Sequence, residues 1–250
     1  METEKDYEIH YYEVDYKKRA LITSIINYFG DIATKQSEDM SIGFKYMEEN
    51  KIAWVIHKWD ININSFPKYG DIIKVKTRPK YFQKFYAYRD FEIRDRNGEK
   101  IIEALSQWLL IDTDKRKLKK IPEELCKAYK VEETECKAVK MSKIKKLKNI
   151  NNEKIFNVRY SDIDTNGHVN NSKYVSWIIE TVPLEIVLNY TLKNLKMDYK
   201  KETVYGDKVK ALCEIENKDD IIICRHSIID KDGNELNLAE TTWQKNKEAD

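Results

Sequence analysis

A short run of acidic, amide and imidazole side chains lies in residues 159–180, RYSDIDTNGHVNNSKYVSWIIE. Its polar residues fall within ten positions, where a predicted strand gives way to a predicted helix: Asp162, Asp164, Asn166, His168, Asn170 and Asn171. Because Asp164, Asn166 and His168 alternate, an extended backbone would direct all three side chains to one face. An acid, an amide and a titratable imidazole beside a helix N-terminus can transfer protons and stabilise developing negative charge.

A helix-capping loop is the alternative explanation for this polar run. Aspartate and asparagine are favoured caps and turn formers, and Gly167 is ordinary loop chemistry. The chain offers a comparison, because YYEVDYKKRALI at residues 11–22 also precedes a predicted helix and lacks the cluster. Since one helix is capped without these residues, the cluster favours a function in one part of the chain.

An internal repeat of about 135 residues organises the chain. The segment YGDIIKVKT from Tyr69 returns as YGDKVKALC from Tyr205, at an offset of 136. At an offset of 135, Asp95, Gly98, Ala104 and Trp108 match Asp230, Gly233, Ala239 and Trp243. Because two blocks match in order with a single gap, we infer a duplication.

Each repeat has the pattern of one helix followed by several long strands. Residues 55–63 and 209–215 alternate between apolar and mostly polar side chains, which is typical of strands in a sheet with one wetter face. Gly98 and Gly233 mark hairpin turns, and Pro183 is expected to begin a short helix. Before each strand block, apolar residues recur at helical spacing: Leu21, Ile25, Phe29 and Ile32, then Tyr174, Trp177, Ile178 and Thr181. We therefore expect an α+β fold with two repeats, each a helix wrapped by an antiparallel β-sheet.

Three segments are expected along the chain. They are an N-terminal half at residues 1–120, a lysine-rich crossover linker at residues 121–154 and a C-terminal half at residues 155–250. The linker lacks clear periodicity and contains Pro122, so we expect one short helix in it at most.

Length and charge exclude several classes of protein. A chain of 250 residues with 41% hydrophobic residues can build a substantial core, and a net charge of +2 gives no overall attraction to nucleic acid. No run approaches the ~18–20 apolar residues of a membrane span, and METEKDYEIHYYEV lacks the apolar stretch of a signal peptide. We expect a cytoplasmic protein that binds neither nucleic acid nor a membrane.

The cysteines and histidines have no spacing typical of a metal motif. Cys126, Cys136, Cys213 and Cys224 include no CxxC pair and are expected to be isolated, partly buried thiols. His10, His57 and His226 are expected to be structural or exposed. We therefore expect neither a metal site nor a cofactor.

The sequence resembles the acyl-ACP thioesterases, which release fatty acids from acyl carrier protein (ACP). The resemblance rests on RYSDIDTNGHVNNSKYVSWIIE and on MDYKKETVYGD from Met197. The first-half segments WVIHKWDININSFPKYGDIIKV, EALSQWLLI and DKRKLKKIP add to it, and it runs from about residue 8 to 245. It implies a tandem, or double, hot-dog fold with an acyl-binding N-terminal half and a catalytic C-terminal half.

The resemblance also implies that Asp164, Asn166, His168 and Glu202 are catalytic. Plant members have a cysteine after the glutamate, where this chain has Thr203. Either water attacks the thioester directly, as we expect, or another group serves as the nucleophile. Glu202 is the expected general base and acts with His168, while Asn166 holds the thioester or the water. Asp164 is expected to orient Asn166 or its loop.

Two backbone groups complete the expected site. The N–H groups near Val169 and Asn170 are the expected oxyanion donors. No metal is expected to take part.

The expected partner is an ACP that carries a fatty acyl thioester, and a monomer or a homodimer would satisfy the fold. The sequence leaves three alternatives open: a hydrolase of acyl-CoA or another small thioester, a non-catalytic acyl-binding module, and a dehydratase or hydratase of the same fold. Acyl chain length is also left open.

Overall fold

The computed structural model describes residues 1–131 and 141–246. They fall into two compact units: unit 1 comprises residues 1–59 and 64–141, and unit 2 comprises residues 60–63 and 142–250. The boundary at residues 141 and 142 lies inside the segment expected to be a linker. Residues 132–140 of that segment, with Cys136, Lys137 and Lys140, lie outside the described residues. No helix in the described ranges has the length and apolar character needed to cross a membrane.

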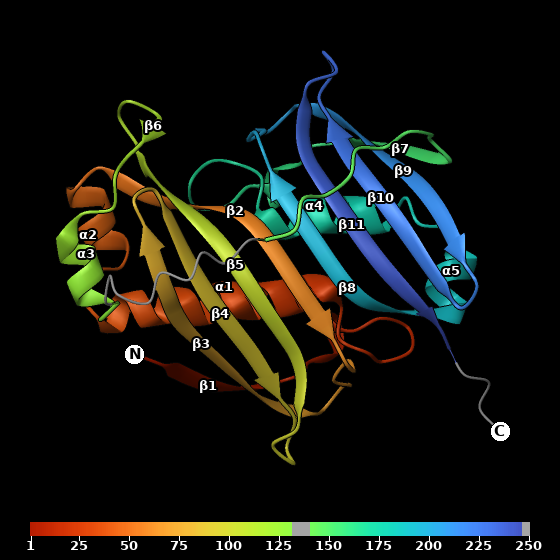
Figure 1. The fold of residues 1–250 in the computed structure, drawn as a ribbon, viewed down its shortest axis with the longest axis horizontal. Helices are drawn as coiled ribbons and strands as arrows, with labels where there is room; N and C mark the ends of the chain where they lie inside the picture. Colours follow the sequence, from red (N-terminus) through yellow and green to blue (C-terminus); the bar gives the residue numbers. More distant parts are fainter. Residues whose placement is uncertain (132–140, 247–250) are drawn as a thin grey trace. The chain divides into compact units, whose positions relative to one another are not determined.

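Unit 1 is an antiparallel sheet with a long helix on one face (Figure 1). Its strand order is β1-β3-β4-β5-β2, and β6 pairs with β5. In chain order the elements are β1 (Thr3–Glu8), the 3-10 helix η1 (Tyr11–Glu13), α1 (Ile22–Asp39), α2 (Phe44–Glu49), β2 (Ile52–Ile63), β3 (Ile72–Gln83), β4 (Tyr86–Arg94), β5 (Lys100–Asp112), β6 (Lys117–Leu118) and α3 (Glu123–Ala128).

Unit 2 repeats this plan, with α4 on one face of its sheet (Figure 1). Its strand order is β8-β11-β10-β9-β7, which is the order of unit 1 read from the other end. In chain order the elements are β7 (Asn152–Asn157), the 3-10 helix η3 (Tyr160–Asp162), α4 (Asn171–Ile179), α5 (Leu184–Asn189), β8 (Tyr190–Tyr199), β9 (Lys208–Lys218), β10 (Ile221–Ile229) and β11 (Glu235–Lys245).

The apolar stripe of α1 forms the core of unit 1. Ile25, Phe29 and Ile32 have no exposed surface, because their helical spacing directs all three toward the sheet. The Phe29 ring lies 4.7 Å from the Phe91 ring on β4 and 5.7 Å from the Trp59 ring on β2. Burial of such aromatic side chains contributes about 2–3 kcal/mol each, so this contact fixes the helix on the sheet.

The helix of unit 2 packs in the same way but is shorter. Tyr174 and Trp177 of α4 are buried, and the Trp177 ring stacks on Phe156 of β7 at 5.8 Å. The helix ends at Ile179, so Thr181 lies beyond its end, although the spacing placed Thr181 on the helical stripe. The short helix α5 follows Pro183, which confirms that expectation.

Strand register confirms the duplication. Thr77 is opposite Phe91 in unit 1, and Cys213 is opposite His226 at the corresponding place in unit 2. The repeat also preserves a hydrogen bond, because Trp108 Nε1 donates to Ser106 Oγ at 2.7 Å and Trp243 Nε1 donates to Thr241 Oγ1 at 2.9 Å. The two expected hairpins are present as well, and Gly98 and Gly233 both have φ of 81°. The α+β fold of two helix-and-sheet repeats is therefore confirmed.

Candidate active site

The polar run of unit 2 forms a closed loop between η3 and α4. Ile163 and Val169 form an antiparallel bridge, and inside it the Asp164 N–H donates to the His168 carbonyl at 2.8 Å. The Gly167 N–H donates to the Asp164 carbonyl at 3.1 Å, and Gly167 has φ of 78°, a value that glycine adopts without strain. The extended backbone expected for Asp164–His168 is therefore wrong, because these hydrogen bonds fold the segment into a turn.

Asp162 anchors the start of this loop. Its carboxylate is fully buried and accepts hydrogen bonds from the Arg159 backbone N–H at 2.9 Å and from Arg159 Nη2 at 3.0 Å. Burial by itself would raise the pKa of Asp162, but the hydrogen bonds and charge of Arg159 outweigh it and hold this pKa below its usual value. Sequence reasoning counted Asp162 in the polar run without giving it a role, since nothing local indicated that it would be buried.

His168 and Glu202 meet although they are 34 positions apart in the sequence. His168 Nε2 lies 3.1 Å from Glu202 Oε2, and the two side chains are 22% and 35% exposed. Glu202 lies in the loop between β8 and β9, and the Val169 N–H donates to the Thr203 carbonyl of that loop at 3.0 Å. This backbone hydrogen bond holds the two loops together, so an imidazole and a carboxylate face each other at a place that solvent can reach.

Asn166 is the exposed tip of the loop. Its backbone N–H donates to Asp164 Oδ1 at 2.8 Å, so the Asp164 carboxylate fixes the turn that carries Asn166. In the described part of the chain, no group forms a hydrogen bond with the Asn166 side-chain amide. That amide can therefore bind a carbonyl oxygen or a water molecule without breaking an existing contact.

The backbone groups expected to form the oxyanion site are engaged elsewhere. The Val169 N–H donates to Thr203 O at 3.0 Å, and the Asn170 N–H donates to Asp162 O at 2.8 Å. Asn170 instead caps α4, because its Oδ1 accepts from the Ser172 N–H at 2.9 Å. The structure does not support the expected role of these two N–H groups, because both bonds hold the loop closed. The Asn166 side-chain amide is the more accessible donor.

Thr203 follows Glu202 and its hydroxyl is already bonded. Thr203 is 4% exposed, and its Oγ1 donates to Asp207 Oδ2 at 2.7 Å. The same carboxylate accepts from the Val204 N–H at 3.1 Å, and these bonds lower the pKa of Asp207. The arrangement closes the turn before β9, and the burial of Thr203 limits the access of a substrate carbonyl to its hydroxyl.

Tyr174 of α4 is a buried neighbour of the site that sequence reasoning treated only as core. It is 2% exposed. Burial and the nearby charges of Glu202 and Asp164 raise its pKa, so its phenol stays neutral. Its helical spacing explained its burial and gave no signal of its position beside the carboxylates.

Unit 1 contains the same loop without the same chemistry. Val14 and Ala20 form the equivalent bridge, and the Asp15 N–H donates to the Arg19 carbonyl at 2.7 Å. The Asp15 carboxylate then pairs with Arg19 Nη2 at 2.9 Å. By position in this loop, Lys17 and Arg19 correspond to Asn166 and His168. A common loop structure thus carries an amide and an imidazole in unit 2 only, so capping does not explain them.

The fold and this loop define a hot-dog protein with an acid, an amide and an imidazole at the start of its second helix. The family model for the acyl-ACP thioesterase N-terminal domain matches residues 1–129, and the model for the C-terminal domain matches residues 145–245. The chain therefore belongs to the acyl-ACP thioesterase family.

Individual relatives share little more than a quarter of their residues with this chain. A chloroplastic palmitoyl-ACP thioesterase of Arabidopsis thaliana is 27% identical over 96% of this chain, and the match spans 63% of the plant protein's length. A chloroplastic dodecanoyl-ACP hydrolase of Cinnamomum camphora is 26% identical over 96% of this chain and 67% of its own length.

Solved structures show the same fold. A Lactobacillus plantarum protein assigned as an oleoyl thioesterase has a TM-score of 0.94 at 25% identity, covering 99% of this chain and 98% of its own. The 12:0-ACP thioesterase of Umbellularia californica has a TM-score of 0.87 at 23% identity, covering 98% of this chain and 94% of its own.

Proposed function

We propose that the protein hydrolyses fatty acyl-ACP to a free fatty acid and ACP. The observation that carries this proposal is the 3.1 Å contact between His168 Nε2 and Glu202 Oε2, in a loop that also carries Asn166, whose side-chain amide has no hydrogen bond within the described residues. Family membership supports the substrate class, because the curated relatives are named for acyl carrier protein that bears a palmitoyl, dodecanoyl or oleoyl group. Those names differ in acyl length, so the proposal covers fatty acyl chains as a class.

In the proposed mechanism, water attacks the thioester directly. Glu202 takes a proton from water, and the resulting hydroxide adds to the thioester carbon. The Asn166 side-chain amide donates to the carbonyl oxygen as it gains negative charge. The proton then passes across the contact with Glu202 to His168 Nε2. The C–S bond breaks, and the imidazolium protonates the leaving thiolate.

Asp164 completes the arrangement as a positioning residue. Its carboxylate holds the backbone of Asn166 at 2.8 Å, so it sets the direction from which the amide approaches the substrate. Thr203 stays outside the reaction, because its hydroxyl donates to Asp207. No covalent acyl-enzyme is required.

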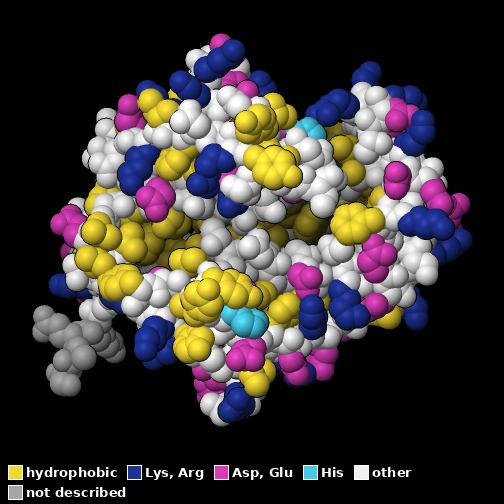
Figure 2. All heavy atoms as spheres, turned by 180° about the vertical axis from the view of Figure 1, so that it is seen from behind, with side chains coloured by type: hydrophobic (Ala, Val, Ile, Leu, Met, Phe, Trp, Pro, Cys, Tyr) yellow, Lys and Arg dark blue, Asp and Glu magenta, His cyan; other side chains and the backbone are white. Residues whose placement is uncertain are grey.

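We further propose that ACP docks through a local group of lysines. Figure 2 shows basic and acidic side chains interspersed on the face it draws, so attraction of an acidic carrier depends on a local excess of charge. Within the described part of the expected linker, exposed basic side chains follow the unit boundary: Lys143, Lys145, Lys146 and Lys148. A second exposed basic group lies in unit 1: Lys115, Arg116, Lys117 and Lys120. A solvated linker without a docking role is the alternative.

The direct test is product analysis with purified protein. Incubation with long-chain acyl-ACP should release free fatty acid and free ACP thiol in equal amounts, at a kcat/KM well above that for the same acyl group on CoA. Faster hydrolysis of acyl-CoA would assign the protein to small-thioester substrates. Binding without acid release would identify a non-catalytic module, and conversion of enoyl or hydroxyacyl thioesters would identify a hydratase.

The cytoplasmic location stays a prediction, since the plant relatives are named as chloroplastic proteins.

A further inference from the structure

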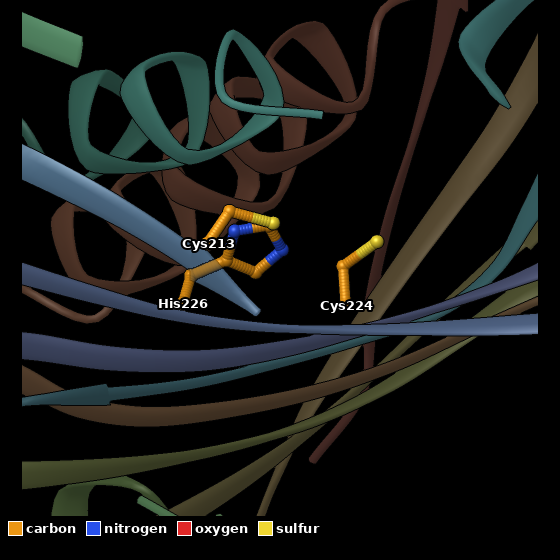
Figure 3. A group of neighbouring side chains, drawn as sticks. All are labelled: Cys213, Cys224 and His226. Carbon is orange, nitrogen blue, oxygen red and sulfur yellow. The ribbon is translucent and has the colours of Figure 1, made fainter. Parts of the chain in front are cut away.

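Two thiols and an imidazole gather inside unit 2, apart from the loop of His168. Figure 3 shows Cys213 on β9 and Cys224 and His226 on β10, with all three side chains on one side of the sheet. Their ligand atoms all lie within 4.8 Å of one another, and none of the three residues has exposed surface. The register explains the cluster, because Cys213 is opposite His226 and Cys224 lies two residues before His226 on the same face.

The hydrogen bonds of His226 leave the lone pair of one ring nitrogen available to a metal ion. The Thr181 hydroxyl donates to the Ile178 carbonyl at 2.7 Å, so Thr181 Oγ1 accepts from His226 Nδ1 at 3.2 Å. The proton of the neutral imidazole therefore sits on Nδ1, and Nε2 carries a lone pair. Thr241 Oγ1 lies 3.0 Å from Nε2 and accepts from Trp243 Nε1 at 2.9 Å, so its own proton can be donated to that lone pair.

This is the arrangement that a metal-binding histidine usually has. Such a histidine donates its other N–H to a fixed acceptor, which sets the tautomer and the ring direction. Thr181 is that acceptor here, and it is 1% exposed and held by Ile178. A metal ion would take the place of the Thr241 proton at Nε2 and of the two thiol protons, and the Thr241 hydroxyl can rotate to donate elsewhere.

The chemistry of the three ligands and their complete burial indicate which metal ion suits the site. Two thiolates and one neutral imidazole are soft or borderline donors that suit Zn²⁺. Two thiolate charges also neutralise a dication, which matters because an uncompensated buried charge is costly. We propose that unit 2 binds one Zn²⁺ ion through Cys213, Cys224 and His226 Nε2, with Thr241 Oγ1, 3.0 Å from Nε2, beside the site. Zinc bonds of about 2.0–2.3 Å imply ligand separations of about 3.5–3.8 Å, so separations of up to 4.8 Å would have to shorten by about 1.3 Å at most.

Unit 1 shows how the fold fills the same place without a metal. The positions equivalent to Cys213, Cys224 and His226 are Thr77, Arg89 and Phe91. The Arg89 guanidinium is 8% exposed, and its Nη1 donates to Thr77 Oγ1 at 3.1 Å and to Gln36 Oε1 at 2.5 Å. A permanent cation thus occupies this position in unit 1. Two thiols occupy it in unit 2, where a zinc ion would supply the positive charge.

Zinc content of the intact protein tests the proposal. Because the three residues are fully buried, zinc is supplied in the expression medium, so that it can bind as the chain folds. Native mass spectrometry should then detect one zinc ion per chain, and zinc-edge X-ray absorption should show two sulfur ligands and a histidine nitrogen. Cys213→Ala, Cys224→Ala and His226→Gln should each lose the ion. Cys126→Ala, which removes a thiol from α3 in unit 1, should keep it.

Three results would overturn the zinc site. They are wild-type protein without stoichiometric zinc, a zinc spectrum without sulfur ligands, and equal zinc content in the Cys213→Ala and wild-type proteins. The wild-type absorption spectrum decides the question even if a buried substitution prevents folding. The reaction proposed above uses other residues, so loss of zinc leaves that proposal standing.

Discussion

Glu202 and His168 are brought together by a backbone hydrogen bond between the residues that follow them. The N–H of Val169 donates to the carbonyl of Thr203 at 3.0 Å, and the side chains beside this bond meet at 3.1 Å. Unit 1 has the equivalent backbone bond, from the Ala20 N–H to the Pro67 carbonyl at 2.8 Å. There the preceding residues are Arg19 and Phe66, which cannot exchange a proton near neutral pH. The duplication supplied the scaffold, and of the two sets of equivalent positions only the one in unit 2 carries an imidazole and a carboxylate.

Asp164 is expected to act on turnover through Asn166, and unit 1 supplies a matched control. Asp164→Asn weakens the acceptor that holds the Asn166 backbone, whereas Asp15→Asn weakens the same contact to Lys17, also 2.8 Å long. Both variants should lose thermal stability. Only Asp164→Asn should lower kcat for acyl-ACP, by about 10-fold or more, because the Asn166 amide is misplaced. Equal kcat in the two variants would show that the Asp164 turn has no part in the reaction.

Thr203 is expected to be dispensable for the chemical step. Its hydroxyl is bonded to Asp207, so Thr203→Ala should weaken the turn and leave kcat within about threefold of wild type. Rapid-quench mass spectrometry of the wild-type enzyme should detect no acyl group bound to the chain. An acyl adduct on any side chain, with an anhydride on Glu202 the first to look for, would contradict direct attack by water.

Sequence patterns predicted the repeated elements because these depend on local spacing. Alternation along 209–215 and the helical stripe of Ile25, Phe29 and Ile32 are properties of single segments, and the structure has β9 and α1 there. The polar run also indicated that Asp164, Asn166 and His168 share one loop ahead of a helix, and the structure has them in the loop between η3 and α4. Its closed shape was missed, because the bridge of Ile163 with Val169 joins residues whose types do not indicate pairing.

Contacts between segments were harder to predict from the sequence. Glu202 came only from family resemblance, since an isolated glutamate in a charged stretch carries no local signal. Cys213, Cys224 and His226 were expected to be separate, because their spacing matches no metal motif. They meet because of strand register, which requires knowing that Cys213 faces His226 across β9 and β10.

Asp162 is expected to control the acid stability of unit 2. Its pKa in the folded protein lies below the value of about 3.9 for an unfolded aspartate, because Arg159 offsets the effect of burial. The resulting stabilisation is complete above that unfolded value and is lost as the pH falls through the lower folded value. Asp162→Asn should therefore cost about 2 kcal/mol at pH 7, with a smaller loss near pH 2. Denaturant unfolding across this pH range measures it, and a cost that does not change with pH would contradict the assignment.

Carrier docking is expected to depend on the lysines that follow the unit boundary. Reversal of the exposed Lys143, Lys145 and Lys146 to glutamate should raise KM for acyl-ACP at low salt and leave kcat nearly unchanged, since exposed charges act mainly on encounter. The same three residues changed to glutamine should give an intermediate KM. Hydrolysis of a small neutral thioester serves as the control and should not change. Acyl-ACP kinetics that are unaffected at low salt would show that the carrier docks elsewhere.

The most direct test of the proposed reaction compares two histidines that each contact a glutamate. His168 Nε2 lies 3.1 Å from Glu202, and His10 Nδ1 lies 3.1 Å from Glu13 at the 3-10 helix η1 of unit 1, ahead of the loop that matches the one carrying His168. The measurement is kcat for long-chain acyl-ACP hydrolysis by folded His168→Gln and His10→Gln proteins at saturating substrate. The proposed mechanism predicts a loss of at least ~100-fold for His168→Gln and wild-type turnover for His10→Gln. Turnover by His168→Gln within threefold of wild type would contradict it.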